Sequence, residues 1–223
     1  MSPIRAVTFD VAGTLIEPHP SVGAVYSAAL RRLDVGTLLE APALEIRFQE
    51  AWRARGAFDY SRVSWTGVLR RVFDGVVDPA DFDRAFEAVW LRFAEADAWR
   101  VHDDVNPCLE FLRRRGIRRA VVSNWDERLH AVMHAIGLAP WFEFILPSVE
   151  GAGPKPEPRL FLEAVERLGL NPGEVLHVGD SFREDVQGAR EAGLAVCWLR
   201  RGVAGSGLAP GSISTLGDLK TRL

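Results

Sequence analysis

Short apolar runs separated by amphipathic segments make up most of the sequence outside residues 17–98. Five runs have the length of a buried strand: 5–9, 120–122, 144–146, 175–178 and 195–199. Between the later runs, apolar residues recur at helical spacing in the segments 106–115, 128–136, 158–168 and 184–192. Buried strands that alternate with helices are typical of a parallel sheet with helices on both faces. We therefore predict an α/β fold with a doubly wound parallel sheet.

Residues 17–98 follow a different pattern. Apolar residues repeat at helical spacing in four segments there, 22–33, 44–52, 65–73 and 82–93, and we find no convincing strand. Each segment has one apolar face, and the four faces need one another to become buried. We therefore predict an all-α domain of residues 17–98, inserted into a core of residues 1–16 and 99–223. Most of its aromatic residues should be core, and Trp52, Trp65 and Trp90 are candidates to line a pocket.

The residues that carry chemistry follow the apolar runs. In order along the chain they are Asp10, Ser123 with Asn124, Lys155 between two prolines, and Asp180 with Asp185. In a parallel sheet, ligands bind beyond the carboxyl ends of the strands, so these side chains should converge at one edge. Each of them has an ordinary structural role when it occurs alone, such as a helix cap for a strand-end aspartate. The complete set in this order indicates a functional site.

Such a set of residues suits phosphoryl transfer. Carboxylates from two strand ends, Asp10 and Asp180, are the hard oxygen ligands that Mg²⁺ prefers, and the metal would offset the charge of a phosphate. Asp10 would then attack phosphorus and form an aspartyl-phosphate. The candidates to hold the phosphoryl oxygens are Ser123, Asn124, Lys155 and the backbone N–H groups of Gly13 and Thr14. Positioning and charge stabilisation are most of what this reaction needs.

These motifs resemble those of the haloacid dehalogenase superfamily, whose members are aspartate-nucleophile hydrolases with a Rossmann-like core. The matching segments are 9–15 (FDVAGTL), 122–124 (VSN), 155–158 (KPEP) and 179–185 (GDSFRED), and residues 17–98 resemble the family's C1-type α-helical cap. The resemblance implies that Asp10 is the nucleophile and a metal ligand. It also implies metal contacts from the Ala12 carbonyl and from Asp180, with Asp185 beside it. Ser123 and Lys155 would bind the transferred group.

Ala12 departs from the pattern of the superfamily's phosphatases. They usually carry a second aspartate at this position, which protonates the leaving oxygen and then activates water. General acid–base catalysis contributes roughly 10²–10⁴-fold, so its loss would slow turnover without abolishing it. Either another group supplies the proton or the leaving group needs little protonation. Glu17 and His19 are the nearest candidates in the sequence, although both are also ordinary hinge residues.

Other readings of Ala12 stay open at this point. Phosphonoacetaldehyde hydrolases resemble this motif but use a cap lysine, and residues 17–98 contain no lysine. Haloacid dehalogenases usually carry Tyr at this position and lack the acidic fourth motif. A dehalogenase, or a weakly active protein that binds a phosphorylated metabolite, therefore remains the alternative to a Mg²⁺-dependent phosphatase. We expect residues 53–65 to contribute most to substrate selection, through Arg53, Arg55, Tyr60 or Arg62.

Composition and charge narrow the class of protein. The chain has 223 residues, of which 48% are hydrophobic, and a net charge of −3. The length fits one domain with a large insertion. The slightly negative charge argues against a nucleic-acid surface. No apolar run is long enough to span a membrane. We expect a cytoplasmic protein whose partner is a small phosphorylated molecule, and the oligomeric state cannot be read from the sequence.

A few remaining residues invite functional readings. Cys108 and Cys197 are expected to be buried free thiols. We expect Asp126 to cap the helix that follows it. His130 and His134 have a spacing found in metal sites but lack a third ligand, so we expect them to lie on a packed or solvated face. His177 should lie in the core.

Overall fold

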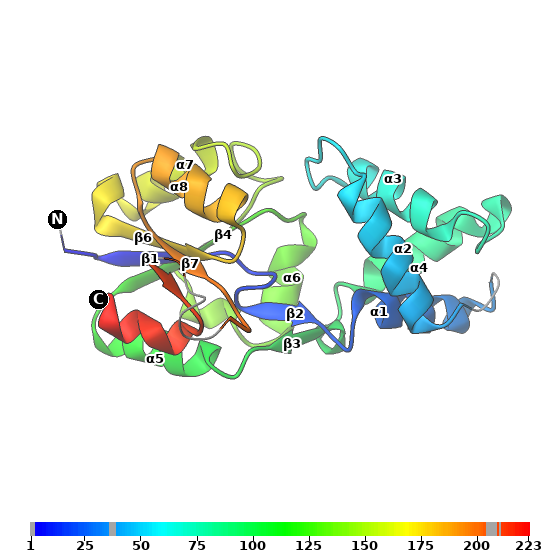
Figure 1. Ribbon diagram of the computed structural model, residues 1–223, viewed down its shortest axis with the longest axis horizontal. Helices are drawn as coiled ribbons and strands as arrows, with labels where there is room; N and C mark the ends of the chain where they lie inside the picture. Colours follow the sequence, from blue (N-terminus) through cyan, green and yellow to red (C-terminus); the bar gives the residue numbers. More distant parts are fainter. Residues whose placement is uncertain (1–2, 36–38, 204–208, 210) are drawn as a thin grey trace.

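A computed structural model describes residues 3–35, 39–203, 209 and 211–223. One six-stranded sheet lies at its centre, in the order β5-β4-β1-β6-β7-β8, with every pairing parallel (Figure 1). Its strands are β1 (Ala6–Phe9), β4 (Arg118–Ser123), β5 (Ile145–Pro147), β6 (Val175–Gly179), β7 (Ala195–Leu199) and β8 (Ser212–Ile213). Phe9 of β1 lies opposite both Val121 and Val178. The predicted parallel sheet is confirmed, and β8 is an addition that the sequence pattern missed.

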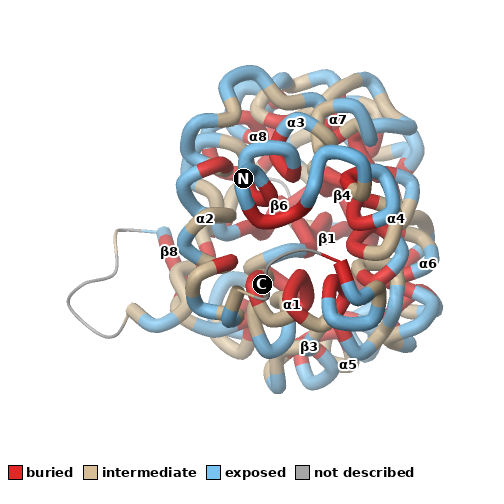
Figure 2. Tube along the Cα trace, turned by 90° about the vertical axis from the view of Figure 1, so that its right-hand side faces the viewer, coloured by how far each residue is buried: buried red, intermediate tan, exposed pale blue. Residues whose placement is uncertain are grey.

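Helices cover both faces of this sheet, as a doubly wound fold requires. Val121 belongs to the apolar cluster that contains α5 (Val105–Arg114) and α6 (Arg128–Ala135). Its neighbour Val122 belongs to the cluster that contains α7 (Arg159–Leu168) and α8 (Gly188–Glu191). Figure 2 shows the buried strands enclosed by exposed outer helix surfaces. The predicted helix 184–192 has an unexpected form, because Phe182–Gln187 is a π-helix and only the last turn is α8.

The four predicted helices of the insertion are present. They are α1 (Val22–Leu33), α2 (Ala41–Arg53), α3 (Arg62–Phe73) and α4 (Phe82–Arg92), at the right of Figure 1. They share an apolar cluster of their own, built around residues such as Tyr26, Leu44 and Phe86. The Ser21 and Ser61 hydroxyls accept hydrogen bonds from backbone N–H groups in the first turns of α1 and α3. Such caps satisfy donors that have no partner within the helix.

A small antiparallel pair of strands joins the insertion to the core. It consists of β2 (Ile16–Pro18) and β3 (Trp99–Val101). The expectation that residues 17–98 contain no strand is therefore wrong at Glu17 and Pro18. Three residues are too few to show a periodicity, and the partner strand is distant in sequence. We propose that residues 17–98 form the cap and that residues 1–16 and 99–223 form the core, with this pair at the junction.

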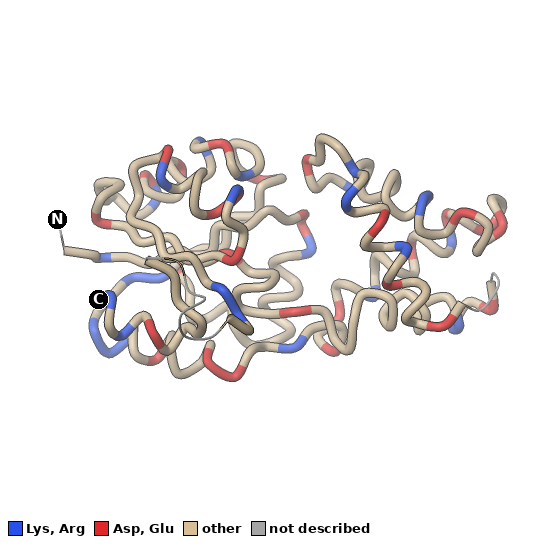
Figure 3. The backbone as a smooth tube through the Cα atoms, in the orientation of Figure 1, with Lys and Arg blue, Asp and Glu red and all other residues tan. Residues whose placement is uncertain are grey.

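Charges of both signs are interspersed over the core and the cap (Figure 3). Within the described ranges, no helix is both long and apolar enough to cross a membrane. Cys108 and Cys197 are buried free thiols, as expected. Burial raises their pKa values to about 12 and about 11, so both stay protonated at neutral pH.

Candidate active site

The first strand leads directly into a tight turn that holds Asp10. Gly13 in this turn has a φ of +82°, and a Cβ atom there would lie 2.5 Å from Asp180 Oδ2. A side chain at residue 13 would therefore displace the Asp180 carboxylate. The Gly13 N–H donates to the Ile16 carbonyl over 2.8 Å, and the Thr14 N–H donates to the Val11 carbonyl over 3.2 Å. Both amides are thus occupied inside the turn, so neither is a free donor for a phosphoryl group.

Asp10 is oriented by two hydrogen bonds to a single oxygen. The Ser123 hydroxyl, at the end of β4, donates to Asp10 Oδ1 over 2.9 Å. Lys155 Nζ donates to the same oxygen over 2.7 Å. The other oxygen, Oδ2, accepts no hydrogen bond from any described residue. One oxygen of Asp10 is therefore fixed by the protein, and the other is left for chemistry in the pocket that Asp10 lines.

Lys155 is enclosed by acceptors. Only 1% of its side chain is exposed, and Nζ donates to Asp10, to Asp185 Oδ1 over 2.5 Å and to the Val122 carbonyl over 3.2 Å. Burial alone would lower the pKa of Lys155, but the negative charges of Asp10 and Asp185 outweigh it and raise the pKa. An ammonium group has three N–H donors, and all three are used here. Lys155 therefore favours the carboxylate forms of Asp10 and Asp185.

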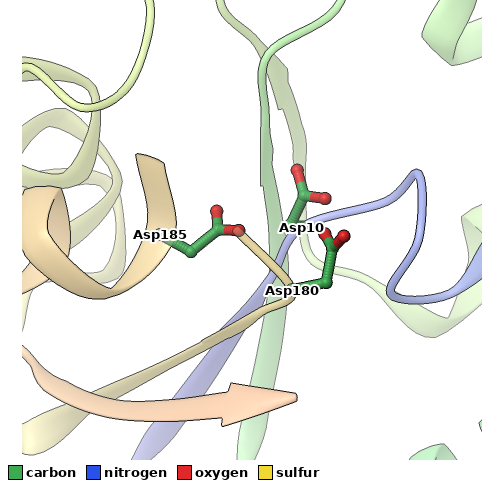
Figure 4. Close-up of side chains that lie close together, drawn as sticks. All are labelled: Asp10, Asp180 and Asp185. Carbon is green, nitrogen blue, oxygen red and sulfur yellow. The ribbon is translucent and has the colours of Figure 1, made fainter. Parts of the chain in front are cut away.

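Asp10, Asp180 and Asp185 form the acidic cluster that the sequence predicted. Their carboxylate oxygens lie within 4.8 Å of one another, and Figure 4 shows the three side chains meeting beyond the strand ends. Burial raises the pKa of Asp10, with Asp185 adding to the effect and Lys155 opposing it. Desolvation by the surrounding protein, and then the charges of Asp10 and Asp185, raise the pKa of Asp180 to about 7, although the residue stays exposed on its pocket side.

Asp185 differs from the other two because protein groups occupy both of its oxygens. Oδ1 accepts from Lys155 and from His177 Nε2 at 3.1 Å, and Oδ2 accepts from the Ser181 N–H at 2.9 Å. Lys155 and His177 hold the pKa of Asp185 below its ordinary value despite burial. His177 lies in the core, as expected. A Cβ atom at residue 179 would lie 2.2 Å from Asp185 Cγ, so this approach requires Gly179.

The buried ion pairs lead to a stability prediction. Replacing Lys155 with Met would leave two buried carboxylates without their cation, which typically costs 3–5 kcal/mol. We expect Lys155→Met to lower the free energy of unfolding by about 3 kcal/mol in chelator at pH 7.5. Lys220→Met is the matched control, since Lys220 is the only other lysine and is exposed. Urea titrations measure both variants, and a loss below about 1 kcal/mol for Lys155→Met would contradict the argument.

Asn124 and Glu184 connect these groups to the cap. Asn124 Oδ1 accepts from the Lys155 N–H over 2.7 Å, and its Nδ2 donates to the Lys155 carbonyl and to Glu184 Oε2. Asn124 was predicted to bind substrate, but its amide is committed to holding the Lys155 loop. The cap residue Tyr60 donates to Glu184 Oε1 over 3.4 Å. Burial raises the pKa of both Glu184 and Tyr60, that of Tyr60 to about 12.

A cavity of about 420 Å³ extends from Asp10 and Asp180 to the cap helices. Trp52, Trp65 and Trp90 line it, as the sequence suggested. Of the four substrate-selecting candidates, Arg55 and Tyr60 line it, whereas Arg53 is exposed elsewhere and Arg62 pairs with Glu87. The acid–base candidates Glu17 and His19 do not line it, and Glu17 instead pairs with Arg100.

Sequence reasoning assigned no role to Glu184, although it belongs to the fourth motif and lines the pocket. Its proximity to Tyr60 depends on how the cap meets the core. No spacing along the chain could indicate that contact.

A sequence model of haloacid dehalogenase-like hydrolases matches residues 4–193 of the chain. The chain belongs to this hydrolase family. It is 35% identical over 202 residues to human haloacid dehalogenase-like hydrolase domain-containing protein 3, covering 86% of this chain and 80% of the relative. It is 30% identical over 205 residues to a phosphoglycolate phosphatase of Pseudomonas putida, covering 89% of this chain and 70% of that protein.

Solved structures of the family agree with the fold. The crystal structure of a HAD phosphatase from Thermococcus onnurineus superposes with a TM-score of 0.69 at 28% identity, over 98% of this chain and 97% of that one. Haloacid dehalogenases of known structure share the fold as well.

The remaining candidate residues have structural roles in this hydrolase. Asp126 is buried, accepts from the Arg128 N–H and pairs with the Arg128 side chain at the start of α6. Asp126 thus satisfies a first-turn N–H as the capping prediction expected, but it lies one residue before the N-cap, which is Glu127. His130 Nε2 lies 2.9 Å from Glu150 Oε2 in a surface hydrogen bond. Among the described residues, His130 and His134 lie outside the cluster formed by Asp10, Asp180 and Asp185.

Proposed function

We propose that this hydrolase is a Mg²⁺-dependent phosphatase that acts on a small phosphorylated molecule through an aspartyl-phosphate on Asp10. The observation that carries the proposal is how the two oxygens of the Asp10 carboxylate are hydrogen-bonded. Lys155 and Ser123 hold one of its oxygens, the other accepts no hydrogen bond from the described residues, and Asp180 lies beside it in an open pocket. The similarity to phosphatases named for phosphoglycolate and phosphoserine supports the same reaction class.

The donor set fits a hard divalent cation. Three carboxylates face one ammonium group, so the cluster holds excess negative charge in a partly desolvated place, as the raised pKa values of Asp10 and Asp180 show. Mg²⁺ prefers carboxylate and carbonyl oxygens and retains several waters. We propose that Asp10, Asp180 and the Ala12 carbonyl hold it, with Asp185 in support. When bound, the metal would offset the charge of the incoming phosphoryl group.

The reaction has two steps, formation and hydrolysis of the aspartyl-phosphate, and residues of this chain act in both. Asp10 Oδ2 attacks phosphorus while the bond from phosphorus to the ester oxygen breaks, and the leaving oxygen takes a proton from water. A second water attacks phosphorus, which releases inorganic phosphate and restores the Asp10 carboxylate. Lys155 and Ser123 orient Asp10 throughout, and the charge of Lys155 favours the carboxylate form of Asp10 before the first step and after the second. Because all three N–H donors of Lys155 are already used, a contact from Lys155 to the phosphoryl group would require it to exchange an acceptor.

A substrate panel tests the function itself. Purified protein is assayed with Mg²⁺ for phosphate release from phosphate monoesters and for halide release from 2-haloacids. The proposal predicts phosphate release that stops when a chelator is added. Halide release without phosphate release would identify a dehalogenase, and neither product would identify a binding protein.

Removal of Asp180 tests the metal site. We expect Asp180→Asn to lose Mg²⁺ binding in calorimetry, because the amide removes one of the charges that attract the cation. Asp103→Asn is the matched control on the core surface, since Asp103 is exposed and lies outside the cluster. Equal Mg²⁺ affinity in Asp180→Asn and the parent protein would show that the metal site has been misassigned.

A further inference from the structure

The cap side of the pocket is built largely from aromatic rings. The rings of Trp52 and Trp65 stack with centroids 5.4 Å apart, and Phe48 stacks on Trp52 at 5.9 Å. All three line the pocket and are only partly buried, so apolar surface faces the cavity. Phe93 and Trp99 continue the same wall. Such a surface favours contact with an apolar ligand, because both surfaces are then removed from water.

Most polar groups on this wall contact other protein groups, although Arg55 and the Trp65 indole keep N–H donors that have no partner among the described residues. The Arg128 guanidinium is paired with Asp126 through two hydrogen bonds and lies 3.5 Å above the Trp90 ring. Arg55 donates to the Trp52 carbonyl, and its guanidinium lies 3.7 Å above the Trp52 ring. The Tyr60 hydroxyl is directed to Glu184. A hydroxyl placed against the ring faces would lose water without gaining a partner, whereas a carboxylate could still pair with Arg55.

Independently of the pocket wall, Ala12 restricts which leaving groups the site can release efficiently. Without a side-chain acid at residue 12, the site favours a leaving oxygen that departs as an anion. A phenol ionises near pH 10, as the tyrosine side chain does, whereas an aliphatic alcohol is a far weaker acid. A leaving group joined to phosphate through a phenolic oxygen therefore reduces the need for a proton donor. The pocket wall and the reaction chemistry point to one substrate class.

We propose that the preferred substrates are aryl phosphates, in which an aromatic ring is bonded directly to the ester oxygen. The ring would lie against the Phe48, Trp52 and Trp65 wall while the phosphoryl group meets Asp10. A cavity of about 420 Å³ is of the size that encloses such a molecule. This inference rests on the proposed phosphatase function and specifies the substrate class of the same site.

Binding of non-hydrolysable phosphonates tests the inference without turnover. Benzylphosphonate mimics phenyl phosphate, cyclohexylmethylphosphonate is its saturated counterpart, and 3-phosphonopropionate mimics phosphoglycolate. In calorimetry with Mg²⁺, benzylphosphonate should bind about 10- to 100-fold more tightly than 3-phosphonopropionate, because its ring buries apolar surface. It should also bind about 3- to 10-fold more tightly than the cyclohexyl compound, because aromatic rings pair with additional energy.

Variants of the wall provide the matched comparison. The Trp65 indole N–H has no partner among the described residues, so Trp65→Leu removes a ring without breaking a hydrogen bond. This variant should bind benzylphosphonate about 3- to 10-fold more weakly and leave 3-phosphonopropionate within about twofold. Trp141→Leu, outside the pocket, should change neither affinity. If Trp65→Leu does not fold, Phe48→Leu makes the same test.

The possible outcomes distinguish a failure of the aryl phosphate proposal from a failure of the proposed phosphatase function. If all three phosphonates bind equally, or the polar one binds most tightly, the aryl phosphate proposal is overturned while phosphatase function stands. If the cyclohexyl and benzyl compounds bind alike, the pocket selects apolar groups and the aromatic claim is wrong. If neither the phosphonates nor inorganic phosphate binds with Mg²⁺, the proposed function itself fails, and this inference fails with it.

Discussion

Replacing Asp10 with Asn should lower phosphate release by about 10⁴-fold or more, which is the order of loss when an enzyme's nucleophile is removed. The amide keeps the size of the side chain, and its oxygen can still accept from Ser123 and Lys155, which now hold Asp10 Oδ1. The substitution removes the negative charge of Asp10 Oδ2, the oxygen that would attack phosphorus. An amide is too weak a nucleophile to attack a phosphate ester at a useful rate. Initial rates on an aryl phosphate with saturating Mg²⁺ provide the measurement.

The interpretation requires that the variant be folded. Circular dichroism and urea unfolding should place Asp10→Asn close to the parent protein, since Asp185 still neutralises Lys155. Asp103→Asn, on the core surface, should retain full activity and serves as the charge-matched control. If the folded Asp10→Asn enzyme kept more than about a tenth of the parent rate, another residue would have to be the nucleophile.

Replacing Ala12 with Asp should speed turnover of alkyl phosphates by about 10- to 10³-fold, within the usual contribution of one acid–base group. Residue 12 lines the pocket two positions after Asp10, and its side chain is exposed there. A carboxyl group at this position could protonate the leaving oxygen and then activate water. Aryl phosphates should gain less, because a phenolic leaving group needs little protonation. The ratio of the two rates in each enzyme is the quantity to compare.

An unchanged ratio would contradict this account of Ala12. The variant must first be shown to be folded and to bind Mg²⁺ as the parent does. If both substrate classes then react as they do in the parent, another group already transfers the proton. If neither class reacts in either enzyme, the role of the protein lies outside phosphatase chemistry.

The sequence predicted the central sheet well because its information is local. The strands are short apolar runs, and parallel pairing places all their carboxyl ends at one edge. Asp10, Ser123 and Asp180 could therefore be grouped without any knowledge of contacts. The strands β2 and β8 were missed because they have three and two residues, too few for a pattern. Their pairing depends on partners that are distant in sequence.

The contacts within the site were harder to predict than the residues that make it up. Nothing in the sequence shows that the Gly13 and Thr14 amides are used inside their own turn. The enclosure of Lys155 by three acceptors likewise depends on how β1, β4 and the π-helix meet. Glu184 and Tyr60 meet only because the cap is folded against the core. These features are tertiary and carry no periodicity along the chain.

The most direct test of the account is a crystal structure of the protein with Mg²⁺ and beryllium fluoride. Beryllium fluoride mimics a phosphoryl group bonded to a carboxylate, so it reports which residue carries the phosphoryl group. The account predicts a beryllium–oxygen bond to Asp10, with Mg²⁺ held beside it by Asp180. Beryllium fluoride bound to another residue, or absent from the pocket while Mg²⁺ occupies its site, would contradict Asp10 as the nucleophile.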